Sequence, residues 1–240
     1  MCGRYSLTHS SEEIAARFNV EITFEVSPRY NVAPTDQMPV IRSGGQQGAE
    51  AREAAVLRWG LVPFWADDES IGYRMINARS ETVGEKPAFR AAFRRRRCLV
   101  VVDAFYEWVE DNDKKWPIRI TVGDEPLGAF AGIWERWSGD DRVIESYTIL
   151  TTDAHDVVAP LHDRMPVWAP QDHWDAWLFG DEAPQQVLES MIEHFPADSV
   201  GYGPVSPKLN RPGNEGEELM DPERVEGLPE RSPGEPLAAR

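Results

Sequence analysis

The chain has 240 residues, of which 41% are hydrophobic, and it carries 41 acidic against 25 basic side chains, a formal net charge of −16. This composition is typical of one soluble domain with a full core. The longest apolar run, 98–102, is far below the roughly 18 residues of a membrane-spanning helix. Two cysteines exclude a disulfide framework, and no metal-ligand spacing occurs. We expect a cytoplasmic protein with no metal, no cofactor and no membrane partner.

The acidity is not confined to the C-terminal end. The last thirty residues hold eight acidic and four basic side chains, which leaves 33 acidic and 21 basic ones in residues 1–210, a net charge of −12. This excludes a uniformly basic nucleic-acid surface and is typical of a salt-adapted protein. Any binding of nucleic acid would therefore depend on local arginine clusters and on stacking.

The first predicted element is a helix over residues 11–18, because Ser10 and Glu13 form a capping-box pattern ahead of Ile14 and Phe18. Later helices are predicted near 170–178, with Pro170 in the first turn, and near 184–195. Strands are predicted at 40–41, 55–59, 98–102, 105–109, 117–122, 128–137 and 146–152. This order of helices and strands predicts a single α+β domain over residues 1–210, with a mostly antiparallel, barrel-like sheet and a few peripheral helices.

From residue 211 onward, proline, glycine and glutamate dominate and aromatic residues are absent. Such a segment buries too little of its own surface to offset chain entropy. We therefore predict a disordered tail over residues 211–240.

Cys2 follows the initiator Met1, so loss of one residue would leave an amine and a thiol on adjacent carbons. This pair condenses with an aldehyde to an imine and then closes to a thiazolidine. An α-amine with a pKa of about 7.7–8 and a thiol with a pKa of about 8.5 are both partly unprotonated near neutral pH. The alternative is an inert, frayed terminus.

Two further residues suit proton transfer. Glu107 lies in the otherwise apolar run 105–109, where loss of hydration would raise the pKa of its carboxyl group. His162 lies close to Arg164, Met165 and Pro166, a composition suited to a rigid loop, and histidine titrates near neutrality. Alternatively, Glu107 faces water on an edge strand, and His162 is a core residue whose ring nitrogens are hydrogen-bonded within the protein.

Asn77 and Arg79 alternate in a short extended segment, so both side chains can point to one face. Arg79 can hold a phosphate, and Arg4, close to Cys2, is a second phosphate candidate. Phe64 and Trp65 can stack on a base.

Arg94 to Arg97 form the only basic run in the chain. In a strand the four side chains would alternate between two faces, so that two would contact DNA and two would contact the acidic surface. A purely solvated role for all four is equally open. Trp59 and Trp108 fit the core better than a binding surface. Cys98 is expected to be a buried structural thiol.

Six motifs occur in order along the chain. They are Met-Cys-Gly-Arg at 1–4, Arg-Tyr-Asn-Val-Ala-Pro-Thr at 29–35, Trp-Gly-Leu-Val-Pro at 59–63, Asn-Ala-Arg-Ser-Glu-Thr at 77–82, Phe-Tyr-Glu-Trp at 105–108 and His-Asp-Arg-Met-Pro at 162–166. Together they resemble the SRAP family of SOS-response-associated peptidases, over residues 2 to about 210. One departure is Val101-Val102-Asp103-Ala104, where the family more often has a proline and a glycine.

The resemblance implies that Cys2, once Met1 is removed, crosslinks to abasic sites in single-stranded DNA and shields them during the DNA damage response. Glu107 would be the general acid and base, assisted by His162 and Asn77. The implied DNA contacts come from Arg4, Arg79, Ser80, Phe64 and Trp65. A self-processing peptidase step, lyase-type chemistry at the abasic site and a monomeric state are also implied.

Two other classes of function stay open. A cysteine hydrolase with an N-terminal nucleophile, acting on a peptide or amide, would also need a free Cys2, but not the arginines and exposed aromatic residues beside it. A noncovalent single-strand binder would not need Cys2. Mass spectrometry of the protein with an abasic oligonucleotide distinguishes the three.

Overall fold

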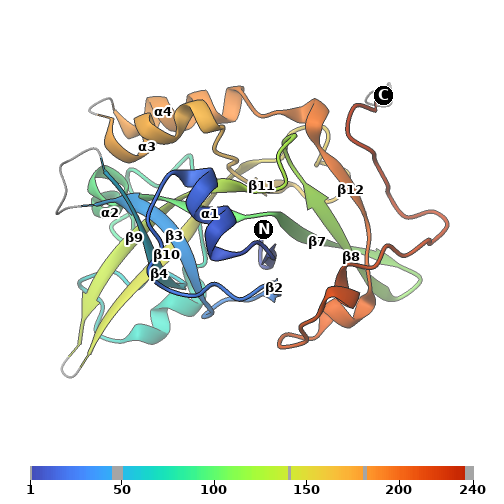
Figure 1. Cartoon of the computed structure of the whole chain (residues 1–240), viewed down its shortest axis with the longest axis horizontal. Coiled ribbons are helices and arrows are strands. Elements are labelled where there is room, and N and C mark those ends of the chain that lie inside the picture. The colour runs from blue at the N-terminus through green and yellow to red at the C-terminus, as the bar shows by residue number, and fades with distance from the viewer. Residues whose placement is uncertain (1, 45–50, 140–141, 181–182, 236–240) are drawn as a thin grey trace.

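The computed structural model of the protein describes residues 2–44, 51–139, 142–180 and 183–235. Five strands close into a barrel, on the left in Figure 1. The strands of the barrel follow the order β10 (Val143–Asp153), β4 (Arg52–Trp59), β3 (Gln37–Ser43), β6 (Arg97–Val102) and β9 (Gly128–Ser138). The barrel closes because β9 also pairs with β10. The β10–β4 pair is parallel and the other four pairs are antiparallel. Every residue of β6 is buried, as its unbroken apolar run predicted.

Two short strands extend the barrel sheet at the end of β10. β5 (Asn77–Arg79) runs parallel to β10, and β11 (Arg164–Pro166) runs antiparallel to it. Thr151 of β10 is opposite Arg79 on one side and Pro166 on the other. Two motifs far apart in the sequence therefore flank the same end of one strand.

A second sheet has the strand order β12 (Gly201–Pro204), β8 (Lys114–Thr121), β7 (Ala104–Asp111), β1 (Tyr5–Leu7) and β2 (Arg29–Val32). A turn joins β7 to β8, and its residues Asn112 and Asp113 have φ values of 48° and 62°. Asn and Asp tolerate this left-handed conformation, which two-residue hairpin turns require. The predicted α+β class with a mostly antiparallel, barrel-like sheet is confirmed.

Strand β1 carries the N-terminal motif into the protein interior. Asp103, which precedes β7, accepts hydrogen bonds from the Ser6 hydroxyl and, at 2.7 Å each, from the amide and hydroxyl of Thr8. His9 Nδ1 lies 3.5 Å from the same carboxylate. Tyr5 of β1 and Tyr147 of β10 share a buried hydrogen bond of 2.6 Å between their hydroxyl groups, which joins the two sheets. Both ends of β1 are thus held.

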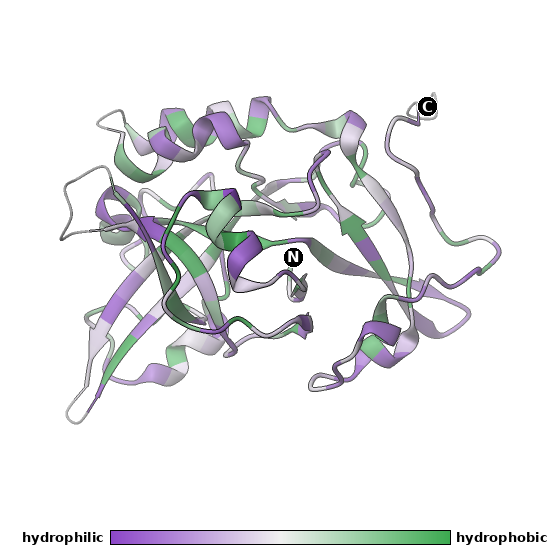
Figure 2. Cartoon of the chain, in the orientation of Figure 1, coloured by the Kyte–Doolittle hydropathy of each residue, from purple (hydrophilic) through white to green (hydrophobic). Residues whose placement is uncertain are grey.

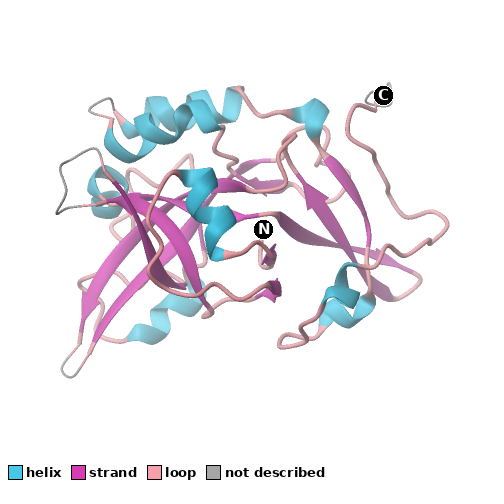
Figure 3. Cartoon of the chain, viewed as in Figure 1, coloured by secondary structure: helices cyan, strands magenta, loops and turns pink. Residues whose placement is uncertain are grey.

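The α-helices lie around the barrel, whereas the 3-10 turns Pro207–Asn210 and Glu217–Met220 lie beside the second sheet (Figure 3). α1 (Ser11–Phe18) has the predicted limits, and its capping box is complete at Ser10 and Glu13. α3 (Trp174–Phe179) follows a 3-10 turn at 171–173, and α4 is Pro184–Glu193, with hydrophobic and hydrophilic residues alternating along it (Figure 2). The sequence did not predict the 3-10 helix Glu69–Arg74 or α2 (Arg90–Arg95). Among the described residues, no helix is both long and apolar enough to cross a membrane.

The described part of the C-terminal segment, residues 211–235, is ordered against the second sheet (Figure 1), which corrects the prediction of disorder. Leu219 is 1% exposed and packs with Tyr106 and Val205. Arg231 exchanges two backbone hydrogen bonds with Tyr202 of β12. The composition argument fails because the segment completes an apolar cluster and a strand edge that the rest of the chain supplies. Residues 236–240 lie outside the described residues.

Candidate active site

Asn77 binds the backbone of Cys2. The Asn77 amide donates a hydrogen bond of 2.8 Å to the Cys2 carbonyl oxygen, and Oδ1 of Asn77 is buried without a hydrogen-bond partner among the described residues. Between Asn77 and Arg79, Ala78 points into the core, so the two polar side chains share the opposite face, as predicted. Asn77 therefore offers a buried acceptor on the same side chain that binds the backbone of Cys2.

The thiol of Cys2 is fully buried, which corrects the expectation of a partly ionised terminal thiol. Burial, with the negative charge of Glu107 as a second cause, holds the pKa of Cys2 well above its usual range. The sulfur lies 3.7 Å from the Arg4 carbonyl oxygen, to which the thiol donates a weak hydrogen bond. A base must therefore take the proton from this thiol before it can act as a nucleophile.

Glu107 lies opposite Ile118 within the β7–β8 pair and is 4% exposed. Strand β7 lies between β1 and β8, so the edge-strand alternative is wrong. Burial raises the pKa of Glu107, as predicted, and the nearby His162 acts in the opposite direction. Glu107 raises the pKa of Cys2, and His162 lowers the pKa of Glu107, so Glu107 lies near both residues.

His162 lies in the loop that enters β11 and is about one third exposed, with 31% of its side chain accessible. Its Nδ1 accepts a 2.9 Å hydrogen bond from the Arg164 amide, and an Asp163 carboxylate oxygen lies 2.7 Å from the same nitrogen. These contacts fix the ring at the rim of the site. The rigid loop suggested by the composition around this residue stays a prediction.

Arg79 is exposed and forms no ion pair with any described residue, as a phosphate contact requires. Ser80, also predicted to contact DNA, is 3% exposed, and its amide donates to Thr151. The β5–β10 pairing turns this side chain inward, so a direct surface contact from Ser80 is not supported.

Arg164 has a structural role that the sequence reasoning missed. It is 8% exposed, forms ion pairs with Glu81 at 2.7 Å and with Asp153, and donates to the Thr151 carbonyl oxygen at 2.8 Å. The only feature of the sequence that pointed to this role of Arg164 was its position two residues after His162. Arg164 ties the loop of His162 to the segment that follows β5.

Phe64 and Trp65 are 58% and 48% exposed, as predicted for stacking residues, and line an open hollow of about 480 Å³ with Pro87, Arg90 and Ala91. The preceding turn depends on Gly60, at φ 114°, where a Cβ atom would lie 2.6 Å from the Gly72 carbonyl oxygen. This close backbone approach needs a glycine.

The basic run does not lie on one strand. Arg94 and Arg95 are exposed on α2, whereas Arg96 forms a 2.6 Å ion pair with buried Glu135. Arg97 is buried and donates to backbone carbonyl groups, including that of Gly180 at 3.2 Å. The expected division between the faces of one strand is therefore wrong, because a helix-to-strand junction separates the exposed Arg94 and Arg95 from the internally bound Arg96 and Arg97. Trp59 and Cys98 are fully buried, as predicted.

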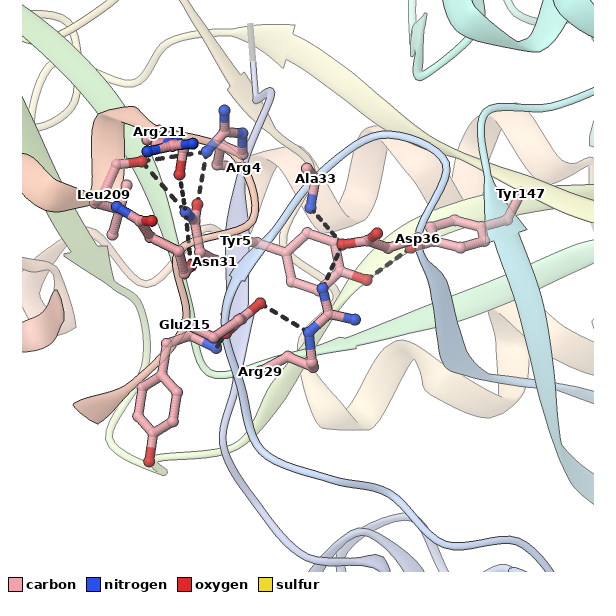
Figure 4. A network of polar contacts seen from close by, with 12 residues as sticks. Arg4, Tyr5, Arg29, Asn31, Ala33, Asp36, Tyr147, Leu209, Arg211 and Glu215 are labelled. Carbon is pink, nitrogen blue, oxygen red and sulfur yellow. Dashed lines mark hydrogen bonds and ion pairs between the residues drawn. The ribbon is translucent and has the colours of Figure 1, made fainter. Parts of the chain in front are cut away.

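Arg4 is half-buried and is already bound within the protein (Figure 4). Its Nη1 donates to Asn31 Oδ1 at 2.6 Å and to the Leu209 carbonyl oxygen at 3.3 Å. Its guanidinium carbon lies 5.8 Å from the ring centre of Trp108, which is therefore part of the site border and not of the deep core.

Comparison with known proteins shows the family to which this chain belongs. Residues 1–212 match the SOS response associated peptidase (SRAP) family. Abasic site processing protein YoaM of Bacillus subtilis is 40% identical over 228 residues, which cover 93% of this chain and 99% of YoaM. Abasic site processing protein HMCES of Xenopus tropicalis is 31% identical over 221 residues, which cover 80% of this chain and 65% of HMCES.

Solved structures share the fold. A crystal structure of a Bacteroides thetaiotaomicron protein matches with a TM-score of 0.83 and 26% identity, covering 93% of this chain and 100% of that protein. A second, from Bordetella bronchiseptica, matches with a TM-score of 0.71 and 29% identity, covering 85% of this chain and 100% of its own. The motifs, the fold and these relatives agree: the chain belongs to the SRAP family.

Proposed function

We propose that the chain binds abasic sites in single-stranded DNA and forms a thiazolidine crosslink through Cys2 after Met1 is removed. The observation that carries the proposal is the placement of Cys2, whose carbonyl group is held by Asn77 at 2.8 Å beside the buried carboxyl group of Glu107. The names of the relatives, abasic site processing proteins, support the choice of substrate.

The proposed chemistry uses both groups of Cys2. The amine attacks the aldehyde carbon of the ring-opened sugar, and loss of one water gives an imine. The sulfur then adds to the imine carbon, and the nitrogen gains the proton, which closes the ring. Glu107 accepts the proton of the attacking group and returns one to the departing hydroxyl, a role that suits a carboxyl group with a raised pKa.

His162 would assist proton transfer from the rim, and the buried Oδ1 of Asn77 would orient the new amine. Exposed Arg79 would hold a phosphate, with Phe64 and Trp65 stacking on bases. Because the crosslink removes the aldehyde, it would shield the site from strand cleavage during the damage response.

The same groups would serve a self-processing peptidase step, hydrolysis of the Met1–Cys2 amide by one water. Lyase-type strand cleavage would proceed from the imine, in competition with ring closure. We propose that the protein acts as a monomer in the cytoplasm, on nucleoid DNA.

Intact mass spectrometry, before and after incubation with an abasic oligonucleotide, tests the proposal. We expect a protein without Met1 and an adduct equal to protein plus oligonucleotide minus one water. Cys2→Ser should give no heat-stable adduct, because an oxygen nucleophile closes a less stable ring. Cys98→Ala is the matched control and should crosslink normally.

Equal crosslinking by Cys2→Ser, or a stable adduct on a protein that keeps Met1, would refute the thiazolidine mechanism. Binding without any adduct would favour a noncovalent binder. Cleavage of an external peptide without DNA binding would favour an N-terminal-nucleophile hydrolase, which has no need for exposed Arg79 and Trp65.

A further inference from the structure

Arg4 is held in a way that leaves part of its guanidinium available. Both of its hydrogen bonds, to Asn31 and to the Leu209 carbonyl oxygen, use Nη1, and the ring of Trp108 supports the group from one side. Nε and Nη2 form no hydrogen bond with the described residues, and Arg4 is two residues from Cys2. A guanidinium fixed at one nitrogen can present the others to a phosphate oxygen.

Asn31, in β2, is the centre of this network (Figure 4). Its side chain is 1% exposed, and its Oδ1 accepts from Arg4. Its amide nitrogen lies within hydrogen-bond distance of three carbonyl oxygens, those of Leu209, Arg211 and Asn214, at 3.3, 3.1 and 3.2 Å. One buried amide therefore ties Arg4 to the C-terminal segment.

Glu215 fastens the same segment to β2. Its carboxylate accepts a 2.8 Å hydrogen bond from Arg29 Nε and another of 2.8 Å from the Tyr30 amide. Arg29 Nη2 in turn pairs with Asp36 at 2.6 Å. Glu215 lies just beyond residue 212, where the match to the family model ends.

We propose that Asn31 is a positioning residue for DNA binding, which together with the segment 209–215 holds the Arg4 guanidinium ready for the phosphate beside the abasic nucleotide. The inference rests on the proposed function for the identity of the ligand. Arginine loses side-chain freedom when it binds a phosphate, and a guanidinium that is already held loses less. Asn31 thus acts on the DNA through Arg4 and makes no contact with it.

The first test uses the full chain with Asn31→Leu, Arg4→Ala and the double variant. Affinity for an undamaged single strand is measured across a range of salt concentrations. Asn31→Leu should weaken binding by about 2- to 12-fold, the cost of immobilising one long side chain. It should also flatten the slope of log affinity against log salt by up to about 0.7, the value for one phosphate contact on a single strand.

The double variant distinguishes positioning from a general structural role. If Asn31 acts through Arg4, adding Asn31→Leu to Arg4→Ala should change affinity little further. Equal losses in both backgrounds, with an unchanged salt slope, would overturn the inference. This test measures binding to undamaged DNA, so its result bears on Asn31 even if the wild type forms no adduct. The absence of an adduct would refute only the proposed crosslinking.

A second pair of variants applies if Asn31→Leu fails to fold. Glu215→Gln removes the charge that pairs with Arg29, and its carboxylate is one third exposed, so the fold should tolerate the change. It should weaken binding in the same direction by a smaller factor, again only when Arg4 is present. Glu217→Gln, which removes an equal charge from an exposed position of the same segment, should not reproduce this dependence on Arg4. Identical effects of the two glutamate variants, or none from Glu215→Gln, would overturn the inference.

Discussion

At the scale of single residues, Glu107 combines a functional advantage with a cost in stability. Its carboxyl group is 4% exposed between β1 and β8, and burial raises its pKa. A carboxyl group that titrates closer to neutrality exchanges protons more effectively. The same desolvation makes the ionised form expensive to keep in the folded protein.

We expect Glu107→Gln to slow adduct formation by about 10²- to 10⁴-fold, the usual loss when a general acid or base is removed. Affinity for an undamaged strand should stay near the wild-type value, because the carboxyl group is buried away from phosphate. Single-turnover crosslinking kinetics and an equilibrium titration separate the two quantities. A variant that lost affinity at an unchanged rate would remove Glu107 from the mechanism.

The effect of Glu107 on stability should have the opposite sign. Between its unfolded pKa of about 4.3 and its higher folded pKa, the folded state binds more protons, so the wild type loses stability as pH rises through this window. Glu107→Gln should therefore have a higher melting temperature than the wild type at pH 8, with the difference disappearing toward pH 4. Thermal melts at a series of pH values test this, and an unchanged difference at all pH values would contradict it.

Some residue-level properties could be predicted and others could not. The burial of Glu107 was predictable because its sequence neighbours are apolar. The burial of Cys2 and the binding of Arg4 were not, because their partners Asn77, Asn31 and Leu209 lie 75, 27 and 205 residues away in the sequence. Local patterns contain no information about contacts of this range.

At the scale of secondary-structure elements, strand β1 depends on Asp103. Burial would raise the pKa of Asp103, but three hydrogen bonds from Ser6 and Thr8 and the nearby ring of His9, 3.5 Å away, outweigh it and lower that pKa. The Asp103 carboxylate, 3.5 Å from Nδ1, raises the pKa of His9. This clamp determines where β1, and with it Cys2, enters the protein.

Asp103→Asn should lower the free energy of unfolding by about 1.5–3 kcal/mol, the usual contribution of hydrogen bonds to a charged group. The His9 contribution is fully present below its unfolded pKa of about 6.5 and is lost as pH rises through the higher folded pKa. Urea unfolding at pH 6 and pH 9 measures both effects. His9→Gln is the control, since it should remove the step above neutrality but keep most of the stability.

Element prediction succeeded where the signal was periodic and local. The capping box fixed α1, and the apolar run at 98–102 fixed β6. Helix α2 was missed because it is short, has no side-chain cap at Phe89 and buries only Ala92 and Phe93. The order of residues 211–235 was missed because the stabilising partners lie in the second sheet.

At the scale of the whole molecule, charge and binding oppose each other. The body of the chain has a net charge of −12 over residues 1–210, while Arg79, Arg90, Arg94 and Arg95 are exposed. Long-range repulsion of DNA should therefore coexist with attraction at contact. Salt screens the long-range part first, because separations there exceed the Debye length of about 8 Å at physiological ionic strength.

We expect affinity for single-stranded DNA to fall less steeply with salt than it would for a basic protein with the same contacts, and moderate salt to speed crosslinking. Arg79→Ala should flatten the slope further, by about 0.7 for one phosphate contact. Crosslinking rates and affinities from low to molar salt test this. A steep, monotonic loss of both would show that the acidic surface lies far from the DNA path.

The bond between Arg4 and Leu209 also has a consequence for synthesis on the ribosome. Cys2 is among the first residues to emerge from the exit tunnel, but its surroundings need Asn77, Glu107 and a carbonyl group 205 residues beyond Arg4. Assembly of the candidate site must therefore wait until nearly the whole domain has been translated. A truncated or stalled nascent chain would display Cys2 without these groups, so the proposed recognition of damaged DNA would be a property of the finished polypeptide alone.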